Sequence, residues 1–354
     1  MTKPWTEDRL DSCKAIVEFI TRHDYGEDSD AVRRALLQDL FFKARGVQTY
    51  EKAAFIAQGA YYLLPRQIRE LFSAEYLGVS NLNTLSVKES KDIGIVTVLK
   101  VELDAVLATF GPPIQSRVDS DGVKYWFCEL QRSDGPPISI VISCVGEAGN
   151  VPCAITVEHI LSRFSVHLMV LIGIAAGPQG EVEFGDVVIA DRVYDYEHVR
   201  AEIQDGKKSE SPRPLYVETP REVKEDLDAF DEGEAKARLH LTLQKIDSAR
   251  FPVKKLEPKF HRGTTAAGER LIADGSLADM RKVDGRILAG DQEDSGFAQA
   301  CKFNKTAWCV FRGISDHGDP LKNNDWHFGA ALTAATAGYV FIEQTYDLPS
   351  TRAL

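Results

Sequence analysis

From Ile93 onward the chain alternates apolar runs of strand length with segments whose apolar residues recur at helical spacing. The strand-like runs include "IGIVTVL", "HLMVLIGIA", "DVVIADRVYDY" and "TAWCVFRGIS". Helical spacing follows in "KVELDAVLATFG", "VPCAITVEHILSRF", "RLIADGSLADMRKV", "SGFAQACKF" and "HFGAALTAATAGYVFIEQ", whereas "KYWFCEL" and "ISIVISC" could form a hairpin. This alternation predicts an α/β fold with helices on both faces of a sheet.

Two stretches depart from the alternation. Residues 1–90 contain four helical patterns separated by turn formers, which predicts a small helical N-terminal domain. Residues 91–348 form the larger predicted domain, and a polar, charge-dense insertion interrupts it at about 197–260.

Composition excludes several classes of protein. The 354 residues carry a net charge of −11, which argues against a nucleic-acid binder with a basic face. The longest apolar run, "VHLMVLIGIAAG", is too short for a membrane span, and the N-terminus lacks the apolar stretch of a signal peptide. Six scattered cysteines without C-x-x-C spacing predict reduced thiols in a cytoplasmic protein. The histidines show no zinc-site spacing, so we expect no metal and no cofactor.

Carboxylates follow three of the predicted strands. Asp316 ends the run "TAWCVFRGIS", Glu102 comes shortly after "IGIVTVL", and Glu293 follows "GRILAG". Ligands of such sheets bind beyond the carboxyl ends of the strands, so these side chains could meet in one crevice. Two structural alternatives stand beside this. Asp316 could cap the next helix, and Glu102 could be a first-turn glutamate that faces the helix dipole.

Six blocks in order give the chain a resemblance to a known family. They are "GIVTVLKVELDAV", "GEAGNVPCAITVEHIL", "GIAAGPQGEVEFGDVVIADRVYDYE", "AAGERLIADGSL", "DQEDSGFAQAC" and "RGISDHGD". The chain from about Ile93 to Glu343 resembles the purine nucleoside phosphorylase/uridine phosphorylase superfamily, in particular its methylthioadenosine/S-adenosylhomocysteine nucleosidase branch. The resemblance implies a three-layer sandwich with a central mixed sheet, and cleavage of the N-glycosidic bond of a purine nucleoside.

The resemblance also implies roles for the three carboxylates. Asp316 matches the general acid that protonates purine N7, Glu102 the general base that activates water, and Glu293 the glutamate that binds the ribose hydroxyls. An exposed aspartate is ionised at neutral pH, so burial or the bound purine must hold the proton that such an acid donates. The chain departs from the family at Gln292, where methionine is usual, and at Asp294, where glycine or alanine is usual.

Further positions match the family's base and sugar contacts. Leu271 and Ile272 match residues that stack on the base and hold its edge, although they could instead be core residues of a helix. The turn that contains Ala175 and Gly177 would let the backbone approach the substrate, and Ser315 precedes the acid.

The 5′ substituent of the substrate is left open. Similar domains act in prokaryotic anti-phage systems by removing adenine from ATP or related nucleotides, and the basic residues that could contact phosphates here are Lys100, Lys207, Lys208 and Arg213. Alternatively, the charged insertion is a solvated surface loop. The expected activity is hydrolysis of a purine nucleoside or nucleotide; a salvage nucleosidase, a phosphate-dependent phosphorylase and a non-catalytic nucleoside sensor are alternatives. We also expect a homo-oligomer, with residues 1–90 available to a regulatory partner.

Overall fold

The computed structural model describes residues 88–119, 122–132, 136–204, 207–246, 256–321 and 323–345. These residues fall within one unit of the chain, Lys88–Leu354. The predicted helical domain over residues 1–90 lies, except for its last three residues, outside the described part and remains a prediction.

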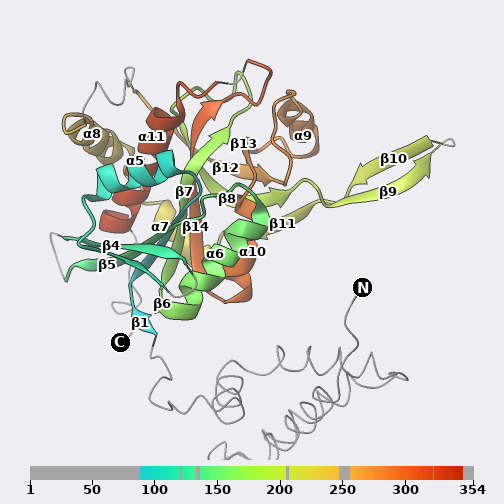
Figure 1. Cartoon of the computed structure of the whole chain (residues 1–354). Helices are drawn as coiled ribbons and strands as arrows, with labels where there is room; N and C mark the ends of the chain where they lie inside the picture. Colours follow the sequence, from blue (N-terminus) through green and yellow to red (C-terminus); the bar gives the residue numbers. More distant parts are fainter. Residues whose placement is uncertain are drawn as a thin grey trace, which may run out of the picture. The chain divides into compact units, whose positions relative to one another are not determined.

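A ten-stranded mixed sheet forms the centre of the described part (Figure 1). Its strands lie in the order β11-β8-β12-β13-β7-β2-β5-β4-β3, and β14 pairs with both β7 and β8. The strands are β2 (Ile93–Thr97), β3 (Gln115–Val118), β4 (Lys124–Leu130), β5 (Ile138–Cys144), β7 (Leu168–Ala176), β8 (Val187–Asp195), β11 (Leu215–Glu218), β12 (Phe260–Ala267), β13 (Ile287–Asp291) and β14 (Ala307–Asp316). Strand β2 is parallel to β5 and β7, and β4 pairs antiparallel with β5, as the hairpin prediction requires.

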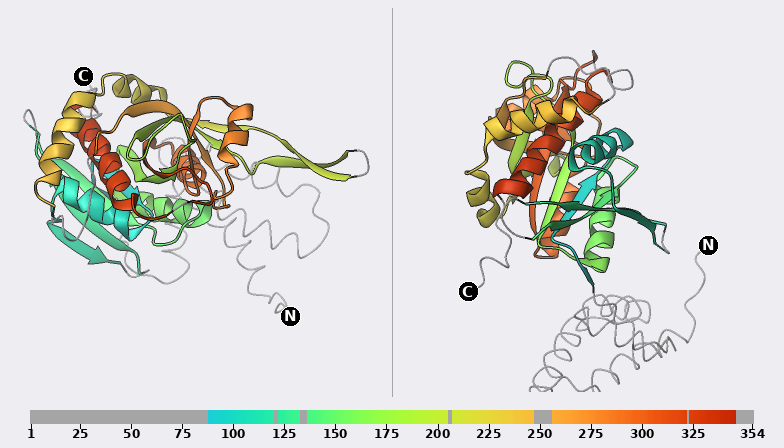
Figure 2. Two further views of the ribbon diagram at one scale, coloured as in Figure 1. Left: turned by 90° about the horizontal axis from the view of Figure 1, so that it is seen from above. Right: turned by 90° about the vertical axis from the view of Figure 1, so that its left-hand side faces the viewer.

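Helices cover both faces of this sheet (Figure 2). They are α5 (Lys100–Phe110), α6 (Asn150–Arg163), α7 (Arg221–Leu227), α8 (Glu232–Leu243), α9 (Leu277–Val283), α10 (Asp294–Phe303) and α11 (His327–Val340), which continues into the π-helical turn η2 (Phe341–Thr345). Alternate residues of a strand point to opposite faces. Accordingly, Val170 and Ile172 of β7 join a core with α5, α8 and α11, whereas Met169 and Leu171 join a core with α6 and α10. The predicted three-layer sandwich is confirmed.

The polar stretch over residues 197–260 is only in part a projecting insertion. Strands β9 (Val199–Gln204) and β10 (Lys207–Pro212) form a hairpin that extends away from the sheet in two views (Figures 1 and 2). After the hairpin, β11 pairs with β8 at the edge of the central sheet, and residues of α7 and α8 enter the first core. A second short pairing joins β1 (Glu89–Ser90) to β6 (Phe164–Ser165).

One predicted helix is shorter than expected. The pattern "RLIADGSLADMRKV" predicts a helix from residue 270, but α9 begins only at Leu277. The reason lies in the turn that precedes it, where Gly275 has a positive φ of 79° and its N–H bonds to the carbonyl of Gly318. Residues 270–276 therefore form a loop.

The carboxyl ends of several strands meet at one edge of the sheet. Ala176, the last residue of β7, pairs with Asp316 of β14 and with Gly290 of β13. Strand β2 lies beside β7 and leads directly into α5. This places the segments that carry all three predicted carboxylates together. Within the described residues, no helix combines the length and the apolar character that crossing a membrane requires.

Candidate active site

A cleft of about 290 Å³ lies at this edge of the sheet. The predicted site residues that line it are Glu102, Ala175, Leu271, Ile272, Gln292, Glu293, Ser315 and Asp316. The other lining residues are Val98, Leu99, Ala148, Ile174, Ala176, Arg270, Gly290, Asp291 and His327. The structure thus brings the three carboxylates, and the residues expected beside the base, into one crevice.

Asp316 lies buried at the end of β14, with 3% of its surface exposed. Its Oδ1 accepts a hydrogen bond from the backbone N–H of Gly318 at 2.9 Å, and its Oδ2 accepts one from the hydroxyl of Ser315 at 2.9 Å. The next helix, α11, begins only at His327, after Trp326 in the cap position. The alternative that Asp316 caps this helix is therefore wrong.

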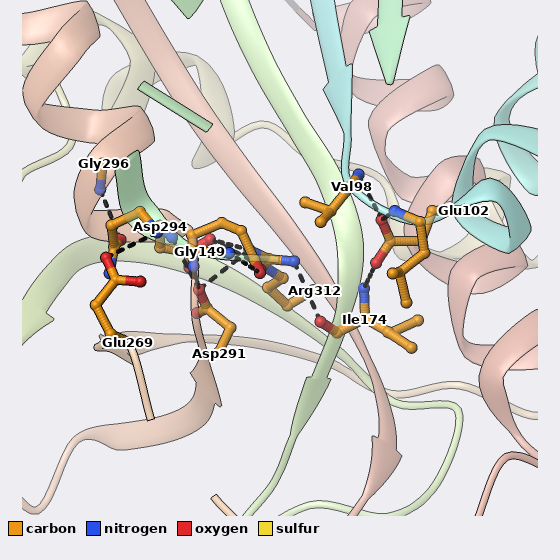
Figure 3. Close-up of polar contacts among 12 residues, drawn as sticks. Val98, Glu102, Gly149, Ile174, Glu269, Asp291, Asp294, Gly296 and Arg312 are labelled. Atoms are coloured by element: carbon orange, nitrogen blue, oxygen red, sulfur yellow. Dashed lines mark hydrogen bonds and ion pairs between the residues drawn. The ribbon is translucent and has the colours of Figure 1, made fainter. Parts of the chain in front are cut away.

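Glu102 closes the first turn of α5 and also faces the cleft. Its Oε2 accepts the backbone N–H groups of Val98 and Leu99 at 2.7 and 2.8 Å, and its Oε1 accepts that of Ile174 at 2.9 Å (Figure 3). The two amides at 2.7 and 2.8 Å lie at the start of the helix, so the first-turn alternative describes one part of the geometry. A carboxylate offers about four acceptor sites. Three are occupied by described residues, which leaves a site on Oε1.

Burial and the neighbouring charges have opposite effects on the pKa of Glu102. Burial raises the pKa of this carboxyl above its ordinary range, while the positive charge of Arg312 and the backbone donors oppose the rise. A carboxylate with a raised pKa is a stronger base than an exposed one, and a buried one excludes competing solvent.

Glu293 lies between a helix start and a buried arginine. Its Oε1 accepts the N–H of Gly149, just before α6, at 3.2 Å, and its Oε2 pairs with Nη2 of Arg312 at 3.1 Å. Arg312 comes from the middle of β14, and none of its side chain is exposed. A carboxylate held from two sides is well placed to accept hydrogen bonds in a fixed direction.

Three carboxylates surround the guanidinium of Arg312 (Figure 3). Asp294 binds it most tightly, through Nε at 2.8 Å and Nη2 at 2.6 Å, both to Oδ1, and Asp291 accepts Nη2 at 3.1 Å. Burial raises the pKa of Asp291 well above its usual range, against the opposing charge of Arg312. The Oδ2 atoms of Asp291 and Asp294 are both buried without a partner among the described residues. A proton retained on Asp291 would lower the excess negative charge there.

Gly173 makes room for the two charged groups that face each other across β7. A Cβ added there would lie 2.4 Å from Nη1 of Arg312 and 2.8 Å from Oε1 of Glu102. Nη1 also donates to the carbonyl of Ile174 at 3.1 Å. A glycine is thus required here for a close approach of side chains to the strand.

The two residues expected at the base differ in exposure. Leu271 is 62% exposed and Ile272 is 6% exposed, and both line the cleft from the loop before α9. Neither residue lies in a helix, because α9 begins at Leu277. The core alternative is wrong for Leu271, whereas Ile272 does belong to a buried apolar cluster, with Ala176 and Leu277. The backbone of this loop is held by the Tyr196 hydroxyl, which donates to the carbonyl of Arg270 at 2.7 Å.

Several predicted contacts are not brought to the cleft. Gly177 lies outside its lining, and a Cβ there would lie 2.3 Å from Val182, so this glycine serves packing. Lys100 pairs with Asp104 at 2.7 Å, and among the described residues neither Lys100 nor Arg213 lines the cleft. Lys207 and Lys208 lie in β10 of the hairpin, and their side chains are outside the described part.

Comparison with known proteins identifies the family of the chain. The model of the Phosphorylase superfamily matches residues 92–339, which is more than half of the chain. The chain belongs to this superfamily. An ATP nucleosidase of Escherichia coli, Cap17, is 33% identical over 298 residues, which cover 80% of this chain and 57% of Cap17. A 5'-methylthioadenosine/S-adenosylhomocysteine nucleosidase of Mycobacterium tuberculosis is 22% identical and covers 57% of this chain and 79% of that protein.

Solved structures of the superfamily show the same fold. The methylthioadenosine/S-adenosylhomocysteine nucleosidase of Streptococcus pneumoniae, in complex with 8-aminoadenine, superposes with a TM-score of 0.54 at 20% identity. The match covers 71% of this chain and 99% of that one. By contrast, the chain spans little more than half of Cap17, 57% of its length.

In this member of the phosphorylase superfamily, sequence reasoning missed Arg312 and Arg270. Arg312 had a detectable signal, because an arginine inside the apolar run "CVFRGIS" has to be paired if that run is buried. Arg270 had none, since it is the first residue of "RLIADGSLADMRKV", a pattern that predicts a helix.

Proposed function

We propose that this chain is a nucleosidase that hydrolyses the N-glycosidic bond of an adenine nucleotide, with ATP as the leading substrate. The observation that carries the proposal is the meeting of Asp316, Glu102 and Glu293 in one cleft. The choice of a nucleotide as substrate is suggested by the relative Cap17, which is named an ATP nucleosidase and is 33% identical to this chain. The products would be free adenine and ribose 5-triphosphate.

Asp316 is proposed as the general acid. When the C1′–N9 bond breaks, its electron pair moves into the purine, and a proton delivered to N7 makes adenine a better leaving group. Ser315 and the N–H of Gly318 fix the two carboxyl oxygens of Asp316 in direction. Ile272 and Leu271 form the wall against which the base would pack.

Glu102 is proposed as the general base. Water attacks C1′ as the bond to N9 breaks, and Oε1 of Glu102, which retains an acceptor site, takes a proton from that water. The proton gained by Glu102 balances the one lost from Asp316, and exchange with solvent restores both groups. Glu293 would accept hydrogen bonds from the ribose hydroxyls, which strengthen as positive charge develops on the sugar.

Three alternatives make different predictions. A salvage enzyme for methylthioadenosine or S-adenosylhomocysteine is supported by the Mycobacterium tuberculosis relative. A phosphorylase would need added phosphate instead of the base Glu102. A nucleoside sensor would bind without turnover.

The biological setting is also part of the proposal. We expect a nucleotide-depleting effector of antiviral defence, because similar domains act in anti-phage systems and an ATP nucleosidase is 33% identical over 80% of this chain. The cytoplasmic location stays a prediction from the scattered cysteines. We retain the predictions of a homo-oligomer and of a regulatory partner for residues 1–90. Size-exclusion chromatography with light scattering tests the first, and pairwise binding assays with residues 1–90 removed test the second.

The deciding experiment follows the products directly. The full chain is incubated with adenosine, methylthioadenosine, AMP and ATP, with and without phosphate, and free base and sugar are separated by chromatography. Adenine release from ATP without phosphate is expected. Release only from methylthioadenosine would establish the salvage alternative, phosphate dependence the phosphorylase, and binding without any release the sensor.

A further inference from the structure

The cleft is acidic, yet the proposed substrate is a polyanion. Its described lining contains the carboxylates Glu102, Asp291, Glu293 and Asp316 and one arginine, Arg270. A second arginine, Arg312, lies behind this lining. Arg312 is buried and its guanidinium is already held by carboxylates. Arg270 differs, because 72% of its side chain is exposed.

Arg270 lies between the two ends of the cleft. On one side of Arg270, Ile272 packs against the turn that follows Asp316. A Cβ added to Gly318 in that turn would lie 2.9 Å from Cγ2 of Ile272. On the other side, the carbonyl of Glu269 accepts the amide of Gln292 at 2.6 Å, next to the ribose candidate Glu293. Arg270 therefore projects from the segment that joins the expected base and sugar sites.

The guanidinium of Arg270 retains free donors. Its Nε donates to Oε1 of Glu197 at 3.0 Å, and its centre lies 5.9 Å from the ring of Tyr196. Neither Nη1 nor Nη2 donates to another residue of the described part. Two NH₂ groups on one planar cation can bind a phosphate in bidentate fashion.

Two of the helix starts near the cleft, those of α6 and α10, are occupied by the protein's own carboxylates. At α6, Glu293 accepts the N–H of Gly149 and Glu269 accepts that of Asn150, both at 3.2 Å. At α10, Oδ1 of Asp291 accepts the N–H groups of Glu293 and Asp294, both at 2.8 Å. These amides would otherwise be natural phosphate ligands. Because these amides are occupied, the exposed Arg270 is the better candidate to meet phosphates at this part of the cleft.

We propose that Arg270 binds the 5′-phosphate groups of the substrate and selects nucleotides over nucleosides. The inference rests on the proposed function. Glu197 holds the arginine at the mouth of the cleft through Nε, and the phosphate binds its two NH₂ groups when substrate enters. Glu197 keeps its own bond to the N–H of Glu269, at 3.0 Å, so the loop stays in place.

The test compares substrates that differ only in phosphate number. Adenine release from adenosine, AMP, ADP and ATP is measured for the wild-type chain, Arg270→Gln and Arg270→Lys. The ratio of kcat/KM for ATP to kcat/KM for adenosine should fall by about 10- to 100-fold in Arg270→Gln, as loss of a charge-assisted bond predicts. The same ratio should fall less in Arg270→Lys, because lysine keeps the positive charge but not the planar pair of NH₂ groups.

A matched control separates this effect from a loss of surface charge. Arg221 on α7 is also an exposed arginine whose Nε bonds to a glutamate, Glu225, at 2.8 Å, and it does not line the cleft. Arg221→Gln should leave the ratio at the wild-type value. The inference would be overturned if Arg270→Gln lost kcat/KM equally for ATP and adenosine. It would also be overturned if Arg221→Gln changed the ratio as much as Arg270→Gln does.

A binding measurement makes the same comparison without turnover. ATP and adenosine are titrated calorimetrically into Glu102→Gln, which is expected not to hydrolyse them, and into the double variant Glu102→Gln/Arg270→Gln. A selective loss of ATP affinity in the double variant supports the phosphate contact even if the wild-type chain releases no adenine, an outcome that would defeat only the proposed function. Unchanged ATP affinity in the double variant, when the wild-type chain hydrolyses ATP, would defeat only the role of Arg270.

Discussion

Oε1 of Glu102 and the backbone N–H of Ile174 are joined by a hydrogen bond of 2.9 Å, although 72 positions separate the two residues. Glu102 follows β2, and Ile174 lies in β7, the parallel neighbour of β2. The bond fixes the carboxylate across the ends of two strands, on the rigid part of the fold. A base anchored in this way keeps its direction when substrate enters.

Glu102→Gln should abolish hydrolysis while the fold survives. Glutamine keeps one acceptor oxygen for the backbone amides, but it cannot take a proton from water. We expect kcat to fall by about 10²- to 10⁴-fold, and stability to change by about 1–3 kcal/mol because one backbone donor faces an NH₂ group. Adenine release and urea unfolding measure the two effects. Near-normal turnover would remove Glu102 as the base.

The pH dependence of turnover reports on the same carboxylate. Burial raises the pKa of Glu102, and the proposed base works only when ionised. Lowering the pH through that raised pKa should therefore reduce kcat/KM, at a pH above the value of about 4.3 for an exposed glutamate. A pH–rate profile measures this limb. If kcat/KM instead fell at the pKa of an exposed glutamate, burial would not raise the pKa of the base.

Asp316→Asn should remove the proton donor with little change in structure. The asparagine oxygen can still accept the N–H of Gly318, and the hydroxyl of Ser315 can rotate to accept from the amide. The expected loss in kcat is about 10²- to 10⁴-fold. Asp319→Asn, in the next turn, is the control, since among the described residues its carboxylate accepts only the N–H of Leu321, at 2.9 Å. Equal losses in both variants would indicate a general disturbance of the loop.

Gly173→Ala should disable the site from within the sheet. The added methyl group would meet Nη1 of Arg312 at 2.4 Å and Oε1 of Glu102 at 2.8 Å, so both groups must shift. We expect a loss of about 1–3 kcal/mol in stability, as for other overpacked positions, and a loss of turnover larger than that destabilisation explains. Wild-type turnover in a stably folded Gly173→Ala would show that neither group needs its present position.

The sequence predicted the parts of the fold that depend on periodicity. The apolar runs placed the central strands, and the carboxylates at their ends were expected to converge because parallel strands end at one edge. The loop before α9 was missed, since its composition resembles that of the helix after it and the turn at Gly275 depends on a contact with Gly318. Such tertiary contacts leave no local signal.

The charge arrangement around Arg312 was likewise hidden. Glu293 was predicted from its place after a strand and from its family position. Its partner Arg312 and the neighbour Asp291 were not, because ion pairs across the fold have no fixed spacing. Asp294 was noticed only as a departure from the family. The structure gives that departure a role, since Oδ1 of Asp294 accepts two hydrogen bonds from Arg312.

The excess of carboxylates around Arg312 should make stability depend on pH through Asp291. Its folded-state pKa is raised well above the usual range by burial, against the opposing charge of Arg312. A carboxyl with a raised folded pKa contributes stability that is fully present below its unfolded pKa, about 3.9, and lost as the pH rises through the folded pKa. The contribution of Asp291 to the stability of the wild-type protein therefore declines from mildly acidic to alkaline pH.

Asp291→Asn should remove that decline. The asparagine oxygen can still accept Nη2 of Arg312 and the two backbone amides, and its NH₂ group imitates a protonated carboxyl beside the unpartnered Oδ2 of Asp294. Relative to the wild type, the variant should gain stability as the pH rises, which urea unfolding at mildly acidic and alkaline pH measures. Asp279→Asn is the control, because that exposed carboxylate on α9 pairs, within the part of the chain that the structure describes, with Lys282 alone. A stability difference that stays constant with pH in Asp291→Asn would show that Asp291 is ionised throughout, with Arg312 supplying enough charge to hold all three carboxylates.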